Sequence, residues 1–491
     1  MKHASLSDLF KQLSEIEKAM LSETKKRSAA IRQVHPLQQN AAKNLIHYLT
    51  LRNKDIRNLQ DQLHICGLSS LASAESHIHR QLQAILQRMG KEYKKEELDH
   101  CTYDYSKKEM DTKSKQLFGD KKESGIPYIM ITFDSSFADN YALIKNLLQN
   151  GMNVARINCA HDNEAIWSRM IQHLKRACKQ TGLSCKIYMD LAGPKIRTRL
   201  LGKGKTEKKV KIKEGEIVWL AESIKKTDEK ETVISPNESG IICMLKKGDR
   251  VYIDDGMIKG FIEKPGEEKA AMRVVRISSS KQLIKEGKGI NFPDTFINIS
   301  PLTDPDKANL PFICEHADMI GFSFVRYTED INALFSIIDK NPSKHPHLII
   351  KIETTEAVKN LPSLLLTTMQ KSLFGVMIAR GDLAVEIGFE RMGEIQEEIL
   401  WICEAAHVPV IWATQVLENL NKSGLATRSE ITDATHAAMA ECVMINKGDH
   451  TIEVIEALRD ILHRTGGHHL KKRYTFRPLS IAQNYMKTLV R

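Results

Sequence analysis

Short apolar runs alternate with amphipathic helical segments along most of this chain, from Ile126 onward. Each run is nearly continuous in apolar residues, a pattern typical of strands buried on both faces of a parallel sheet. The eight runs occupy residues 128–132, 153–158, 185–191, 318–324, 348–353, 374–380, 408–414 and 442–447. Eight buried strands separated by helices predict an α/β fold built on a (β/α)₈ TIM barrel.

The spacer after the third run does not follow the helical pattern. Between Arg199 and Lys288 it contains β-rich runs such as KVKIK, IVWL, RVYID and MRVVRI, broken by Gly and Pro. Alternating runs of this kind predict a small all-β domain inserted into the barrel. We therefore assign residues 126–198 and 288–465 to the barrel and residues 199–287 to an inserted, β-barrel-like lid domain.

The first 125 residues have a different pattern. They contain one proline, Pro36, and apolar residues that recur every three or four positions, as in LSDLFKQLSEIEKAM. This spacing predicts a helical N-terminal extension over residues 1–125. Residues 100–125 are polar, lysine-rich and weakly periodic, so we expect a linker there. Residues 466–491 then form a C-terminal tail.

Composition and cysteine usage indicate a globular cytoplasmic protein. The chain has 491 residues, 42% of them hydrophobic and 27% charged, which is within the globular range. No apolar run reaches the roughly 18 residues that span a membrane, and the start lacks the hydrophobic segment of a secretory signal. The nine cysteines are scattered and never spaced as CxxC, so we expect reduced thiols.

The charge is mildly basic. Seventy-two Lys and Arg against 61 Asp and Glu give a formal net charge of +11. Such an excess suits anionic small substrates, but it is not the dense basic face of a dedicated nucleic-acid binder. We therefore expect neither nucleic acid nor a membrane as a partner.

Polar residues collect where the apolar runs stop. The run ends are Arg156, Asn158, Asp190, Ser323, Lys351, Glu353, Asp382 and Thr414. Active-site residues of (β/α)₈ barrels lie at these C-terminal strand ends. Glu353 and Asp382 end consecutive strands and could share one Mg²⁺, while Lys351 lies on the same strand face as Glu353. Salt bridges that cap the barrel are the alternative for any single residue, but six strands that end this way favour phosphoryl-transfer chemistry.

Nine segments resemble the successive signatures of the pyruvate kinase family, in the order of that family. They are NVARINCAH, MDLAGPKIRT, VYIDDGMI, KGINFP, GFSFVR, IIKIE, VMIARGDLAVEIG, VIWATQVLENL and ATRSEITDAT. The resemblance implies transfer of a phosphoryl group from phosphoenolpyruvate to ADP, followed by protonation of the enolate to pyruvate. The β-rich spacer is similar to the family's mobile domain, which closes over the nucleotide.

The resemblance implies roles for individual residues. Lys351 would neutralise the transferring phosphoryl group, and Arg156 would contact the phosphate. Glu353 and Asp382 would hold Mg²⁺ or Mn²⁺. Thr414 matches the threonine near the methylene carbon, where a hydroxyl, or a water that it orients, could deliver the proton.

Other matching positions serve the substrate carboxylate, a monovalent cation and the nucleotide. Backbone amides around Arg380 to Asp382, which include Gly381, would receive the carboxylate, consistent with anion capture at a helix start. The positions that match ligands of the family's monovalent cation, K⁺, are Asn158, Asp190 and Leu191. The positions that match the nucleotide side are Asn158, His161 and Arg197.

Two departures from the family pattern bear on potassium. Ala160 stands where the family usually has the serine of R-x-N-x-S-H, so one oxygen of the cation site is missing. Lys195 occupies the variable position of G-P-[EK]-I-R-T, where lysine accompanies potassium independence. Because an ammonium can do the work of a bound K⁺, we predict weak or absent potassium dependence.

Two segments near the family's nucleotide phosphates are also replaced. T-I-G-P-A-S is TFDSS at residues 132–136, and S-G-E-T-A is NKGDH at residues 446–450. These changes leave nucleotide geometry and identity open. Lys447 and His450 either hold an anion or are solvated loop residues.

The two ends of the chain differ from ordinary members. The helical extension is similar to one in a divergent bacterial branch, and we expect it to serve packing or homo-oligomerisation. About thirty residues follow the last barrel helix, where ordinary members carry an α/β domain for allosteric control. We therefore expect control of that type to be absent.

Two other functions remain open at this point. One is a Mg²⁺-dependent carbon–carbon lyase acting on enolpyruvate or pyruvate, and the other is a regulatory or binding paralogue with impaired catalysis.

Three pairs of histidines lack a carboxylate or cysteine at metal-ligand spacing, so we expect them on the surface. They are His77 and His79, His345 and His347, and His468 and His469.

Overall fold

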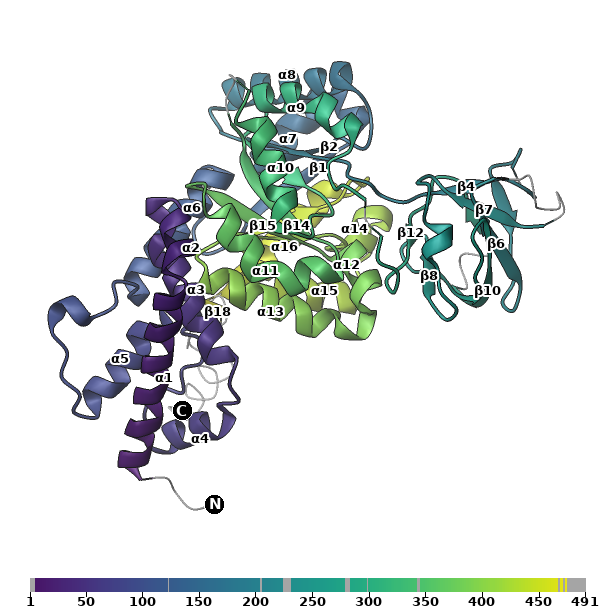
Figure 1. Cartoon of the computed structure of the whole chain (residues 1–491). Coiled ribbons are helices and arrows are strands. Elements are labelled where there is room, and N and C mark those ends of the chain that lie inside the picture. The colour runs from purple at the N-terminus through teal and green to yellow at the C-terminus, as the bar shows by residue number, and fades with distance from the viewer. Residues whose placement is uncertain are drawn as a thin grey trace, which may run out of the picture.

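Eight parallel strands close into a barrel in the computed structural model of this chain (Figure 1). The strands are β1 (Tyr128–Phe133), β2 (Val154–Asn158), β3 (Lys186–Asp190), β13 (Met319–Phe322), β14 (His347–Ile352), β15 (Phe374–Ala379), β16 (Val410–Ala413) and β17 (Cys442–Ile445). Their order around the barrel is β1-β17-β16-β15-β14-β13-β3-β2. The predicted TIM barrel is confirmed, and each apolar run matches a strand to within two residues at either end.

The structure describes most of the chain. The described residues are 5–121, 123–203, 205–223, 231–278, 283–297, 299–341, 345–466, 469–470 and 473–474. None of the helices in these ranges is long and apolar enough to cross a membrane.

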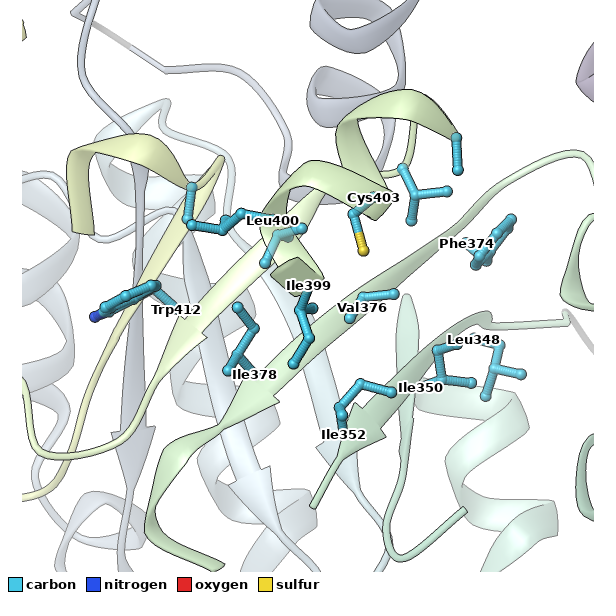
Figure 2. Packing of buried hydrophobic residues seen from close by; sticks show 14 of the residues in the cluster. Leu348, Ile350, Ile352, Phe374, Val376, Ile378, Ile399, Leu400, Cys403 and Trp412 are labelled. Atoms are coloured by element: carbon cyan, nitrogen blue, oxygen red, sulfur yellow. The ribbon is translucent and has the colours of Figure 1, made fainter. Parts of the chain in front are cut away.

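Side chains along each strand alternate between the inside of the barrel and the surrounding helices, as the period of two requires. On β14, Ile349 lies in the inner cluster with Met377 of β15. Leu348 and Ile350 instead belong to the outer core, which Figure 2 shows together with Val376 of β15 and Ile399 of helix α13 (Met392–Ala405). The same alternation turns Lys351 inward at the C-terminal end of β14.

Helices cover the outside of the barrel. Besides α13 they are α7 (Tyr141–Gln149), α8 (Glu164–Thr181), α9 (Asp304–His316), α10 (Thr328–Ile338), α11 (Thr355–Thr368), α12 (Arg380–Ile387), α14 (Glu418–Ser423), α15 (Arg428–His436) and α16 (Thr451–Gly466). Side-chain caps set several of their starts: Asn163 accepts from two amides of α8, and Thr303 forms a capping box at α9. The short 3₁₀ turns are η4 (Ser135–Ala138), η7 (Phe389–Arg391) and η8 (Ala437–Met439).

The spacer after β3 forms strands, as predicted. They are β4 (Thr198–Leu200), β5 (Lys209–Lys211), β6 (Ile217–Ala221), β7 (Val233–Pro236), β8 (Arg250–Ile253), β9 (Ile258–Lys264), β10 (Lys269–Ile277), β11 (Leu283–Lys285) and β12 (Ile290–Asn291), with the 3₁₀ turn η6 (Ile242–Met244). Seven of them pair in the order β12-β8-β9-β10-β6-β7-β4, and β5 pairs with β11. This inserted domain has its own apolar core and projects away from the barrel, across it from the N-terminal helices (Figure 1).

The N-terminal extension is helical, with α1 (Leu6–Lys26), α2 (Ser28–Gln33), α3 (Gln39–Arg52), α4 (Arg57–Ile65), α5 (Ile78–Arg88) and α6 (Tyr103–Phe118), and the 3₁₀ turns η1 (Pro36–Gln38), η2 (Glu75–His77) and η3 (Lys95–Glu97). The expected linker at residues 100–125 is therefore wrong over α6. Leu117 and Phe118 at the end of α6 are fully buried among the inner residues of the barrel, including Tyr128 and Val154. The sequence of α6 is only weakly amphipathic, so the burial of these two side chains against the barrel stabilises the helix.

The extension docks on turns that precede the barrel strands. Asn44 donates to the carbonyl of Ala405 at 2.8 Å, and Lys113 donates to the carbonyl of His407 at 3.0 Å. The ring Nε2 of His407 lies 2.7 Å from the carbonyl oxygen of Ser76. Since these turns lead into β16, the extension covers the end of the barrel opposite the C-terminal strand ends.

The histidine pairs do not behave as one group. His77 and His79 are 8% and 4% exposed, so their expected surface position is wrong. His345 is exposed, and His468 lies outside the described residues. At the chain end, β18 (His469–Leu470) pairs with β19 (Arg473–Tyr474), and the rest of the predicted tail is not described.

Candidate active site

Lys351 lies at the centre of a buried polar network in the mouth of the barrel. Its Nζ donates to Ser323 Oγ at 2.7 Å and to Asp190 Oδ2 at 3.2 Å, and lies 2.9 Å from Glu353 Oε1. Burial opposes its charge, but the carboxylates of Asp190 and Glu353 raise the pKa of Lys351. Lys351 therefore keeps its positive charge inside the mouth.

Asp190 joins this lysine to a second cation. Arg156 places both Nε and Nη2 on Asp190 Oδ2, at 3.1 and 2.6 Å, and Tyr188 donates its hydroxyl to Oδ1 at 3.1 Å. Burial opposes ionisation, yet Lys351 and Arg156 keep the pKa of Asp190 below its usual value. Gly321 faces this group, where a Cβ would stand 1.9 Å from the Tyr188 hydroxyl and 2.4 Å from Asp190 Oδ1. The glycine therefore makes the room that the network needs.

Glu353 is a buried carboxylate whose charge is only partly compensated. Its Oε2 accepts the backbone N–H of Phe324 at 2.6 Å, and Phe324 has a φ of +56°. A left-handed backbone conformation is strained for an aromatic residue. Residues in such strained conformations are concentrated at functional sites. Burial and the negative charge of Asp382 raise the pKa of Glu353, against the opposing effect of Lys351. The carboxylates of Glu353 and Asp382 together are a donor set that suits a hard divalent cation.

Asp382, in the first turn of α12, is held by Lys195. The ammonium lies 2.8 Å from Oδ1 and 3.1 Å from Oδ2, and Asp255 of the inserted domain approaches it to 3.9 Å. Burial opposes the charge, but Asp382 raises the pKa of Lys195. A cavity of about 100 Å³ adjoins this pair, lined also by Asn291 and Glu386. The space beside Asp382 is therefore bounded by both the barrel and the inserted domain.

Thr414 sits after β16 in a strained conformation. Its φ is +43°, and that of Gln415 is +56°, both unfavourable for residues with a Cβ. Its Oγ1 accepts the backbone N–H of Gly381 at 3.0 Å. The hydroxyl hydrogen is then free to be donated elsewhere, because a threonine hydroxyl both accepts and donates.

Comparison with known proteins places this geometry in a family. Residues 128–453 match the family model described as "Pyruvate kinase, barrel domain". The chain belongs to the pyruvate kinase family. It is 32% identical over 327 residues to the pyruvate kinase of Geobacillus stearothermophilus, covering 65% of this chain and 53% of that protein. It is also 32% identical over 331 residues to that of Thermotoga maritima, covering 66% of this chain and 67% of the relative.

A solved structure agrees with this placement. A crystal structure of a pyruvate kinase from Cryptosporidium parvum matches with a TM-score of 0.62 and 25% identity, covering 72% of each chain. The chain spans about half to two thirds of the length of the curated relatives named above.

The positions that match the nucleotide side of pyruvate kinases lie close together. Burial lowers the pKa of His161, and the positive charges of Lys447 and Arg197 lower it further. Arg197 donates to the carbonyl of Gly287 at 2.9 Å, where the inserted domain returns to the barrel. His161 therefore lies within electrostatic range of Arg197 and Lys447, and the three form a basic group.

The oxygens that match the family's monovalent-cation ligands have partners within the chain. Asn158 and Asp190 are register partners on β2 and β3, and Asn158 Oδ1 accepts the N–H of Ala160 at 3.1 Å. The carbonyl of Leu191 accepts the hydroxyl of Ser323 at 2.7 Å. The Asp190 carboxylate is in turn paired with both Arg156 and Lys351.

Sequence reasoning missed the roles that several side chains have in the network. Arg380 donates to Ala413 O at 3.1 Å and to Asp433 Oδ2 at 2.9 Å, and its Nη2 also bonds Thr414 O. Thr132 Oγ1 accepts from Arg156 at 3.1 Å. The signal for Arg380 and Asp433 was present, because both stand in segments that resemble the family's motifs.

Proposed function

We propose that this chain is a Mg²⁺-dependent phosphotransferase that moves a phosphoryl group from phosphoenolpyruvate to ADP and yields pyruvate and ATP. The observation that carries the proposal is the Lys351 network. One lysine and one arginine converge with Asp190 and Glu353 at the C-terminal ends of β2, β3 and β14, inside a barrel of the pyruvate kinase family.

The donor set supports a divalent ion. Glu353 and Asp382 are the residues that would hold Mg²⁺ or Mn²⁺, and the raised pKa of Glu353, caused by burial and by Asp382, reports negative charge that lacks full compensation. Lys195 would have to share Asp382 with the ion. The chemistry that Mg²⁺ supplies when bound is neutralisation of charge on the phosphoryl oxygens.

Lys351 and Arg156 would bind the phosphoryl group. Phosphoryl transfer depends on positioning and on charge stabilisation around the equatorial oxygens. The Lys351 ammonium is fixed by Ser323 and two carboxylates, so it is already oriented before substrate arrives. Arg156 is fixed in the same way by Asp190 and Thr132.

Thr414 would deliver the proton to the enolate, directly or through a water. Its Oγ1 accepts from Gly381, which leaves the hydroxyl hydrogen to point away from α12. The same bond engages the Gly381 amide, so other amides in the first turn of α12 would receive the substrate carboxylate.

The basic group of His161, Arg197 and Lys447 would receive the nucleotide phosphates. Burial and the positive charges of Lys447 and Arg197 lower the pKa of His161, and an anion bound there would offset the repulsion between these cations. Lys447 comes from the replaced segment 446–450, so an anion contact there would compensate for the loss of the family's usual residues.

Potassium would be weakly required or dispensable. The Lys195 ammonium supplies a fixed positive charge beside Asp382, and Ala160 offers no side-chain oxygen. Asp190 is neutralised by Arg156 and Lys351, so little charge is left to attract a monovalent cation.

The test is to incubate the purified full chain with phosphoenolpyruvate, Mg²⁺ and each nucleoside diphosphate, and to follow pyruvate and triphosphate together. We expect equal amounts of both, and a loss of about 10³-fold or more in kcat/KM for Lys351→Ala. Lys340→Ala, at an exposed lysine on the barrel, is the matched control.

Other outcomes reject the proposal. Absence of both products, with Lys351→Ala indistinguishable from the parent, would leave a binding or regulatory paralogue. Pyruvate without triphosphate indicates a phosphatase or another enolpyruvate reaction. A product with a changed carbon–carbon bond indicates the lyase.

A further inference from the structure

Two histidines and one aspartate meet inside the N-terminal extension. His47 comes from α3, His79 from α5, and Asp99 from the segment before α6. His79 Nδ1 lies 2.7 Å from Asp99 Oδ2, and His47 Nδ1 lies 3.6 Å from the same oxygen. One ligating atom from each of the three lies within 4.8 Å of the others. None of these residues takes part in the proposed phosphoryl transfer.

The structure gives no reason for a polar side chain at the buried position of His47. It is 3% exposed, and neither ring nitrogen has a hydrogen-bond partner among the residues that the structure describes. Buried polar atoms are almost always paired, so an imidazole with both nitrogens unpaired requires an explanation such as a missing ion. A neutral imidazole with no hydrogen-bond partner has a ring-nitrogen lone pair that can bind a metal ion.

His79 is oriented by a carboxylate on its far side. Its Nε2 lies 3.5 Å from Glu17 Oε1, while its Nδ1 faces Asp99. Glu17 is itself fixed, since Tyr93 donates to Oε1 at 2.8 Å and Lys91 pairs with Oε2. A histidine that binds a metal through one nitrogen commonly donates the other N–H to such a carboxylate.

We propose that His47, His79 and Asp99 form a binding site for a divalent transition-metal ion, with Zn²⁺ as the best match. Two imidazoles and one carboxylate favour Zn²⁺ or Co²⁺ over Mg²⁺, which prefers oxygen ligands. The ion takes the place of the proton between His79 Nδ1 and Asp99 Oδ2, and that proton is released to solvent. Water completes the coordination.

The position of the site indicates a structural role. It ties α3 and α5 to the segment that leads into α6, whose end is buried in the barrel. The Asp99 side chain is 16% exposed and offers the ion a path from solvent. The bound metal would therefore connect α3 and α5 to α6, whose last residues fill the inside of the barrel.

The experiment uses the full chain, stripped with a chelator and then kept in excess Mg²⁺ so that the barrel carboxylates are occupied. We titrate it with Co²⁺, whose visible d–d bands report nitrogen and oxygen ligands, and then with Zn²⁺. We expect one Co²⁺ per chain, displaced by one Zn²⁺, and a melting temperature that rises with Zn²⁺.

Variants locate the site. His47→Gln and Asp99→Asn should each weaken Co²⁺ affinity by about 100-fold or more, and Glu17→Gln by about 10- to 100-fold. His64→Gln, on the exposed side of α4, is the matched control and should bind as the parent does. If a variant fails to fold, the stoichiometry and spectrum of the parent still decide the matter.

The proposal is overturned if the parent retains no Co²⁺ or Zn²⁺ in excess Mg²⁺. It is also overturned if His47→Gln binds as tightly as the parent, or if His64→Gln loses the binding, which indicates surface histidines. NMR at saturating Zn²⁺ gives one more test. If the His79 ring stays doubly protonated, it is an imidazolium paired with Glu17 and Asp99 rather than a metal ligand, and the proposal is overturned.

Discussion

The ammonium of Lys195 lies 2.8 Å from Oδ1 of Asp382, across 187 positions of sequence. The pair connects the segment that leaves β3 with the first turn of α12, at the edge of the inserted domain. It places a fixed cation beside one of the two carboxylates that we propose as metal ligands.

The first prediction concerns potassium. Lys195→Glu should lower kcat/KM in the absence of K⁺ by about tenfold or more. The variant loses the Lys195 ammonium and places a second carboxylate beside Asp382, which repels it. Added K⁺ should restore part of the loss. Assays in K⁺ and in tetramethylammonium salts measure both effects, and Lys195→Arg, which keeps the charge, is the control. Strong activation of the parent by K⁺ would contradict the proposal.

The second prediction concerns the proton donor. Thr414→Val keeps the shape of the side chain but removes its hydroxyl, and should lower kcat by about 10²- to 10⁴-fold. Thr414→Ser should keep most of the activity, since its hydroxyl can still accept from the Gly381 amide. Exchange of the methyl protons of pyruvate with solvent, followed by NMR, isolates this step. Equal exchange rates in parent and valine variant would assign the proton to another group.

The third prediction concerns pH and stability. Burial raises the pKa of Glu386 to about 7, while its carboxylate accepts from Asn291 at 2.9 Å. Between the unfolded pKa of 4.5 and about 7, the unfolded chain releases a proton that the folded chain keeps. The free energy of unfolding should therefore fall as pH rises through this window, by about 1–3 kcal/mol.

Glu386→Gln tests this pH dependence. The amide imitates the protonated acid and can still accept from Asn291, so the fall between pH 5 and 8 should be smaller in the variant. Urea unfolding with a chelator present measures it. An unchanged pH dependence would mean that Glu386 is ionised in the folded protein at all these pH values.

The fourth prediction concerns α6, whose end is buried inside the barrel. Phe118→Ala removes a fully buried ring among the inner barrel residues, and should lower the free energy of unfolding by about 3–5 kcal/mol. Leu37→Ala, at a residue that is 65% exposed, should change it by less than about 0.5 kcal/mol. A small effect of Phe118→Ala would show that α6 is not needed to close the barrel.

The sequence alone was enough to predict the barrel, the β-rich insertion and most of the polar strand ends. The reason is that parallel strands buried on both faces must be apolar along their whole length, so a polar residue at the end of a run is conspicuous. The alternation of inward and outward side chains then places Arg156, Asp190 and Lys351 in one mouth, as the hydrogen bonds between them show.

Tertiary structure decided the features that depend on distant segments. The segment of α6 has little periodicity of its own, and becomes a helix because Leu117 and Phe118 fill the inside of the barrel. The approach of Lys195 to Asp382 leaves no local pattern, because each residue is an ordinary polar residue in its own segment. The same is true of His47, His79 and Asp99, which three separate elements bring together. A sequence records the periodicity that burial imposes along one element, whereas the distance between two elements is set by how they pack.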